Sequence, residues 1–103
     1  MQLVELLIYI EKRPLMYIKE NNIYFLESFI GGFFMCEFVN EIISEDDRKF
    51  KDLFYYWLKE KYDFESSVSW SDMIKEIDKR EKKQDQIGVF FREFNQFKEE
   101  KLK

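Results

Sequence analysis

The chain has 103 residues, the usual size of one domain, and its 46% hydrophobic and 37% charged residues are typical of a globular protein and not of a disordered one. It has one cysteine, Cys36, and no histidine, which excludes an internal disulfide, the common zinc patterns and every Ser-His or Cys-His nucleophile pair. The formal net charge of −4 argues against nucleic acid as a direct partner and is compatible with a basic protein partner.

The first expected helix covers residues 3–13, and Pro14 ends it because the proline ring disfavours helical geometry at the preceding residue. Residues 15–18 should then form a short extended or turn-like segment whose apolar side chains plug one end of the bundle. The apolar run at residues 3–10 is too short to cross a membrane, and Glu5 interrupts it. It also lacks the features of a signal peptide, so we expect no membrane partner and a cytoplasmic location. The apolar face of this helix consists of Leu3, Leu6, Leu7 and Ile10.

The second expected helix covers residues 23–43, with Asn21 or Asn22 as its N-cap. Two glycines, Gly31 and Gly32, stand in its middle and cost on the order of 2 kcal/mol relative to alanine. We expect a neighbouring helix to approach closely there, or the helix to bend; a phosphate-binding loop is the alternative, but nothing else of that motif is present. Cys36 lies among apolar residues and should be a small core residue. The predicted buried stripe is Leu26, Phe29, Ile30, Phe33, Phe34 and Phe38.

Three further helices follow. Ser44, paired with Asp47 in a variant of the capping box, should begin the third, which ends near Tyr62; Ser69 should cap the fourth, and Asp85 the fifth. A charged run at residues 79–84 reads as a solvated helix end and turn. The predicted buried faces are Phe50, Leu53, Phe54, Trp57 and Leu58 in the third helix, Trp70, Met73, Ile74 and Ile77 in the fourth, and Ile87, Phe90, Phe91, Phe94 and Phe97 in the fifth.

These patterns predict an all-α fold: a compact bundle of about five antiparallel helices forming a single domain over residues 1–103. Most of the twelve phenylalanines should lie in the core of that bundle. No stretch has the clean alternation of a strand. The carboxylates are scattered over exposed helix faces, so an acid-base pair of the glycosidase kind is not indicated. We therefore expect no catalytic residue, metal or cofactor, no small-molecule substrate, and no enzymatic activity.

The charge is distributed unevenly. Residues 37–47 carry five acids and no base, whereas residues 75–83 carry five bases and three acids. One interpretation of the acidic stretch is favourable helix-start electrostatics plus a solvated turn. The other is a docking patch for a basic protein surface, which makes all five acids candidate partner-binding residues. The candidates are Glu37, Glu41, Glu45, Asp46 and Asp47.

Five short motifs follow one another along the chain. They are K-R-P-x-M-Y-I at residues 12–18, L-x-x-F-I-x-G-F at 26–33, F-x-x-W-L-x-x-x-Y at 54–62, S-W-x-x-x-I at 69–74 and F-F-x-x-F at 90–94. In this order and at roughly this spacing, they resemble segments of a family of small bacterial immunity proteins of contact-dependent growth inhibition and related polymorphic toxin systems. The chain departs from that family in turns, where Leu15, Lys19 and Asp63 stand at positions at which the family often has glycine.

The resemblance implies a cytoplasmic protein that binds and neutralises a cognate toxin, expected to be a nuclease, by blocking its active site or substrate groove. The motif residues are mostly apolar, so the resemblance transfers no binding residue to this chain, and the acidic candidates rest on charge alone. The alternative is a small helical adaptor or regulatory subunit that binds another cytoplasmic protein.

Overall fold

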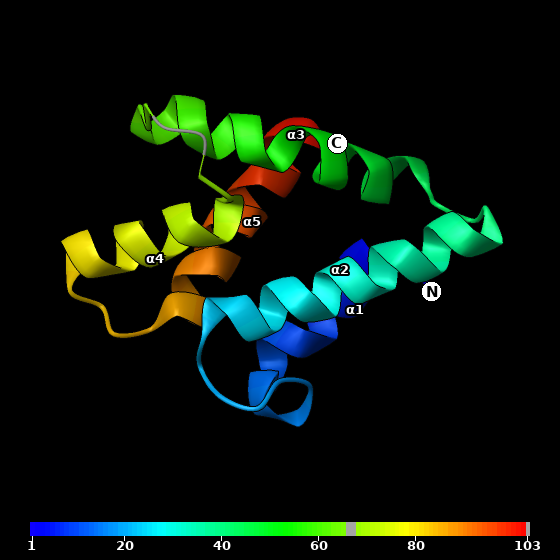
Figure 1. Ribbon diagram of the computed structural model, residues 1–103, viewed down its shortest axis with the longest axis horizontal. Coiled ribbons are helices and arrows are strands. Elements are labelled where there is room, and N and C mark those ends of the chain that lie inside the picture. The colour runs from blue at the N-terminus through cyan, green and yellow to red at the C-terminus, as the bar shows by residue number, and fades with distance from the viewer. Residues whose placement is uncertain (66–67, 103) are drawn as a thin grey trace.

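The structure is a computed structural model that describes residues 1–65 and 68–102. Within those residues it consists of helices and turns without any strand, which confirms the predicted all-α class. The molecule measures 39 × 29 × 24 Å (Figure 1). In Figure 1, α2 and α3 run in opposite directions, while α4 runs in the same general direction as α3. The elements are α1 (Leu3–Lys12), a 3₁₀ turn η1 (Pro14–Met16), α2 (Ile23–Asn40), α3 (Glu45–Tyr62), α4 (Trp70–Glu81) and α5 (Gln86–Lys101).

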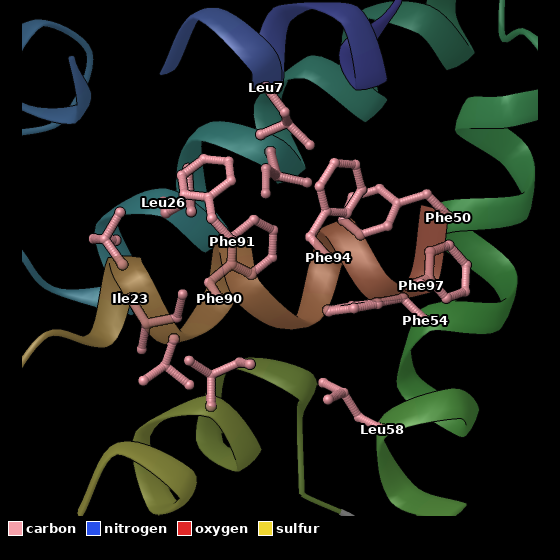
Figure 2. Close-up of a cluster of buried hydrophobic side chains, with 14 of the residues drawn as sticks. Leu7, Ile23, Leu26, Phe50, Phe54, Leu58, Phe90, Phe91, Phe94 and Phe97 are labelled. Atoms are coloured by element: carbon pink, nitrogen blue, oxygen red, sulfur yellow. The ribbon is translucent and has the colours of Figure 1, made fainter. Parts of the chain in front are cut away.

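Helix α5 supplies the centre of the core. In Figure 2, α1 and α2 lie on one side of α5, and α3 and α4 lie on the other side. The buried phenylalanines of α5 fill the space between these helices. The ring of Phe94 lies 5.0 Å from that of Phe50, and the ring of Phe97 lies 5.3 Å from that of Phe54, both edge to face. This is the geometry that aromatic quadrupoles favour. Six of the twelve phenylalanines are buried and four more pack against the core, so most of them are core residues, as predicted.

The helix starts follow the predicted capping residues. A side-chain oxygen of each cap accepts a hydrogen bond from a backbone N–H of the first turn, which would otherwise lack a partner. The four caps are Asn22, Ser44, Ser69 and Asp85. Asn21, the other N-cap candidate, instead accepts from the backbone N–H of Ile87 and so joins the start of α2 to the start of α5. Pro14 ends α1 as expected, since the helix stops at Lys12.

Two predictions about the N-terminal half of the chain are wrong. Leu15 and Met16 do not plug the bundle: they are 68% and 69% exposed, because the 3₁₀ turn directs them outward and only Ile18 of this segment is buried. Helix α2 ends at Asn40, and not near residue 43, because Glu41 adopts a left-handed conformation with φ of 55°.

Three residues assigned to the core are exposed. Phe38 is 77% exposed, Leu53 is 40% exposed, and Cys36 is exposed as well. In Figure 1 the C-terminal end of α2 extends beyond the rest of the bundle. Phe38 and Cys36 lie in that extension, on sides of α2 that no other helix covers. Leu53 lies at the edge of the buried stripe of α3, next to Phe54.

The glycine pair is not explained by packing within the chain. A Cβ atom added at Gly31 or at Gly32 would meet nothing within 4 Å, so no neighbouring helix approaches closely at either position. Helix α2 also runs through both glycines without interruption. The expected close approach is therefore absent from the single chain.

Helix α2 is apolar all round but is little buried. By length and mean hydropathy it is the one helix among the described residues that is long and apolar enough to cross a membrane. Its two acidic residues tie it to the bundle: Glu27 accepts a 2.6 Å hydrogen bond from Ser71, and Glu37 is buried. The helix therefore packs through one narrow side. The buried residues on that side are Ile23, Leu26, Ile30 and Glu37.

Candidate functional site

The five acids proposed for partner binding do not form one surface. Glu37 is 3% exposed and Asp47 is fully buried, so neither side chain can reach a partner in this conformation. The prediction that Glu37 and Asp47 bind a partner is therefore wrong. The periodicity of each helix places these two side chains on the side that faces the core. Glu41, Glu45 and Asp46 remain as surface candidates.

Asp47 caps a different helix. Its two carboxylate oxygens accept hydrogen bonds from the backbone N–H groups of Leu3 at 2.8 Å and of Val4 at 2.9 Å, at the start of α1. Both N–H groups lack a partner within the helix, and the positive end of the helix dipole favours a carboxylate there. Asp47 thus joins α3 to α1 in the interior of the protein.

Glu37 lies beside Asp47. Its Oε1 atom is buried and has no hydrogen-bond partner. Burial, followed by the hydrogen bond to the adjacent Asp47 carboxylate and the charge of that carboxylate, raises the pKa of the Glu37 carboxyl to about 8, although the α-amino group of Met1 acts in the opposite direction. At neutral pH, the Glu37 carboxyl is therefore mainly protonated, and its O–H group donates a hydrogen bond to the Asp47 carboxylate.

The remaining three acids surround the turn between α2 and α3. Glu41 is exposed at the end of α2. The Glu45 side chain is 83% exposed and lies 3.5 Å from Lys49, one turn further along α3. Asp46 is half-buried and faces the opposite side, toward α1 and α5. Ile42, between them in sequence, is 65% exposed, so an apolar side chain projects from the middle of this acidic turn.

A groove of about 690 Å³ lies between α1 and α5, and Asp46 is at its edge. Its lining mixes apolar side chains such as Val4 and Ile8 with Lys98 and Glu99. Among the described residues, no group of three histidine, cysteine or acidic side chains is placed to hold a metal ion.

The most unusual surface is the outer side of α2, which sequence reasoning missed. Ten positions of this helix are exposed and none carries a charge; nine of them, all but Asn40 at the end of the helix, form one continuous neutral surface. Met35 is 62% exposed and Val39 69% exposed, beside Phe38. In the sequence, apolar residues lie on both sides of this helix instead of in one stripe. This pattern could have indicated an exposed apolar face. The outer α2 face, as we name it, consists of Tyr24, Phe25, Ser28, Gly31, Gly32, Met35, Cys36, Phe38 and Val39.

The strongest charge network is structural. Glu93 of α5 is 1% exposed and accepts hydrogen bonds from Lys61 at 2.6 Å, from the Tyr62 hydroxyl at 2.8 Å and from Arg92 at 2.9 Å. Arg92 also pairs with Glu81, which raises the arginine pKa further above its ordinary value. Burial and then Glu93 raise the pKa of the Tyr62 hydroxyl. Every group here has a partner within the network, which fixes α3, α4 and α5 together.

Comparison with models of known protein families, with curated proteins and with solved structures found no match for this chain.

Proposed function

We propose that this protein acts by binding another protein, as a cytoplasmic immunity protein that neutralises a cognate toxin expected to be a nuclease. The observation that carries the proposal is the turn between α2 and α3, where exposed Glu41, Glu45 and half-buried Asp46 surround the exposed side chain of Ile42. The ordered motifs described above supply the specific kind of partner.

The surface suits a basic, substrate-binding groove. Three carboxylates at one end of the molecule attract the arginine and lysine side chains with which a nuclease holds phosphate groups, and they steer the two proteins together. Ile42 offers an apolar anchor at the centre, and such centres contribute most of the binding energy in protein interfaces. Binding there would block access of nucleic acid to the toxin.

The same surface argues for a stoichiometric inhibitor and against an enzyme. Two acids of residues 37–47, Glu37 and Asp47, are buried, and Asp47 is engaged with the start of α1. Asp46 lines the groove between α1 and α5, whereas Glu45 lies on another side of α3 beside Lys49, so these two carboxylates do not face each other as an acid-base pair would.

The test uses the product of the neighbouring gene, which under this proposal carries the toxin domain. Reversing Glu41, Glu45 and Asp46 to lysine should slow association with that domain by about tenfold or more and abolish protection, because rim charges act mainly on the association rate. The effect should shrink at high salt, since the Debye length falls from about 10 Å at 0.1 M to about 3 Å at 1 M.

The matched control reverses three exposed bases, Lys79, Lys82 and Lys83, at the opposite charge extreme of the chain. This variant should bind as well as the unmodified protein or better. If the acidic reversal leaves both the association rate and the protection unchanged in a folded protein, the turn between α2 and α3 is not the docking surface.

A further inference from the structure

The outer α2 face has a property that nothing within the chain explains. Two adjacent glycines in a helix interior cost on the order of 2 kcal/mol relative to alanine. Such a cost is usually offset by close approach of another backbone, yet open space surrounds the Cβ positions of Gly31 and Gly32. Any close approach must therefore come from another molecule.

We propose that the outer α2 face packs against the same face of a second copy of this chain, with the two α2 helices antiparallel and a two-fold axis beside Gly31 and Gly32. An isologous contact of this kind requires a surface that is complementary to itself. This inference does not rest on the proposed toxin binding, although Glu41 borders both surfaces.

The order of residue sizes along the face fits that arrangement. In an antiparallel pair centred on the glycines, Gly31 lies opposite Gly32 of the second copy, Ser28 lies opposite Met35, and Phe25 lies opposite Phe38. The smallest residues therefore meet where two crossing helices come closest, and the largest meet toward the ends, where the helices diverge and leave more space.

The face supplies most of the area that a stable dimer needs. Four of its side chains, Phe25, Met35, Phe38 and Val39, are 39%, 62%, 77% and 69% exposed. Aromatic side chains offer roughly 150–250 Å² each when fully exposed and the aliphatic ones less, so the exposed parts of this face with its flanks present on the order of 600 Å² per copy. A standard protein interface buries about 800 Å² per partner, which the adjoining surfaces would complete.

Charge favours the antiparallel orientation. Near the start of the face, Lys75 lies 5.6 Å from the ring of Tyr24 and Asp72 bonds to its hydroxyl, so this end is close to neutral. The other end carries exposed Glu41. An antiparallel pair places the acidic end of each copy against the neutral end of the other, whereas a parallel pair would place Glu41 against Glu41.

The same charges argue against a lipid surface. Helices that lie in a membrane interface usually carry lysine and arginine on their polar side, which attract anionic lipids. The charged residues of α2 are Glu27 and Glu37, and the net charge of the chain is −4. Anionic membranes would repel such a protein.

The experiment measures the association of the full-length chain by sedimentation equilibrium, in reducing buffer and without any partner protein. The double variant G31A/G32A should weaken dimerisation at least tenfold, because two methyl groups then separate the helices at their closest point. The same variant should keep or raise the thermal midpoint of the monomer, because alanine favours the helix and meets no atom of its own chain. An unfolding artefact would change stability in the opposite direction.

A second variant tests the ends of the face. F38S should also weaken the dimer at least tenfold, whereas Y56S, which removes a 65% exposed aromatic ring from α3, should leave the dimer unchanged. The proposal is overturned if the chain remains monomeric up to about 0.5 mM, a concentration well above the dissociation constants of most specific complexes. It is also overturned if G31A/G32A associates like the unmodified chain, or if the protein floats with phosphatidylcholine–phosphatidylglycerol vesicles as a monomer.

Discussion

The buried pair Glu37 and Asp47 makes the stability of this protein depend on pH. Replacing Glu37 with glutamine keeps the size of the side chain and a donor toward Asp47, but it removes the ionisable proton. In the folded protein the pKa of Glu37 is raised to about 8, above its ordinary value of 4.5. The folded state therefore holds a proton that the unfolded state releases between those two values.

The sign follows from this difference. As pH rises from about 4.5 to about 8, unfolding releases a proton, so the free energy of unfolding falls by about 1.4 kcal/mol per pH unit. The contribution is fully present below pH 4.5 and is lost by the time the pH passes about 8, a total on the order of 5 kcal/mol. The E37Q variant lacks this contribution, so its stability relative to the unmodified protein should increase by about 4 kcal/mol between pH 5 and pH 9.

The assay is urea unfolding of both proteins, followed by circular dichroism at several pH values from 5 to 9. The control is E41Q, which removes an exposed carboxylate one turn further along the same helix and should alter stability by no more than about 0.5 kcal/mol. Parallel stability curves for E37Q and the unmodified protein would show that Glu37 is ionised in the folded state, and the assignment of a shared proton with Asp47 would be wrong.

Three other substitutions test the packing. D47A should lower the free energy of unfolding by about 2–4 kcal/mol in urea titrations, because it leaves two buried N–H groups at the start of α1 without acceptors, whereas D46A should have a much smaller effect. E93Q should cost about 2 kcal/mol in the same assay, since the amide has one acceptor oxygen instead of two, and its NH2 group would face either Lys61 or the donors of Tyr62 and Arg92. Replacing a helical glycine with alanine usually raises the free energy of unfolding by about 1 kcal/mol, but G88A should lack this gain because its Cβ would lie 2.1 Å from the capping carboxylate of Asp85. Equal thermal midpoints for monomeric G88A and G31A would contradict this expectation.

Most of the fold was predictable from the sequence because each helix carries its own start and stop signals. Ser44, Ser69 and Asp85 cap the helices they were expected to cap, and Pro14 ends α1. The phenylalanines of α5 recur at steps of three and four, and all of them are buried. These signals are local, so they need no knowledge of the neighbouring helices.

The errors arise where the answer depends on how far neighbouring helices extend. Phe38 and Cys36 lie among apolar residues like those of a core helix, but the C-terminal part of α2 extends beyond its neighbours. Likewise, the apolar residues Leu15 and Met16 were assigned to the core from composition alone. Apolar character predicts a preference for burial, whereas actual burial requires a surface to pack against.

Periodicity could have separated the two kinds of acid in residues 37–47. Glu37 lies seven residues after Ile30, and Asp47 lies three residues before Phe50, so each continues a stripe whose other members are buried. Glu41 falls beyond the last residue of α2 and is free of that constraint. A charge in the register of a buried stripe indicates an internal partner, and here the two internal acids are partners of each other.

This division links the fold to the proposed surface. Because Asp47 holds the start of α1 and Glu37 holds Asp47, the end of α2 and the start of α3 are fixed relative to the rest of the protein. The turn that connects them, with Glu41 and Ile42 exposed, is therefore presented from a rigid base. Surfaces ordered before binding lose less conformational entropy when a partner docks. It follows that substitutions at Glu37 or Asp47 should weaken partner binding by loosening the turn, although neither side chain reaches the surface.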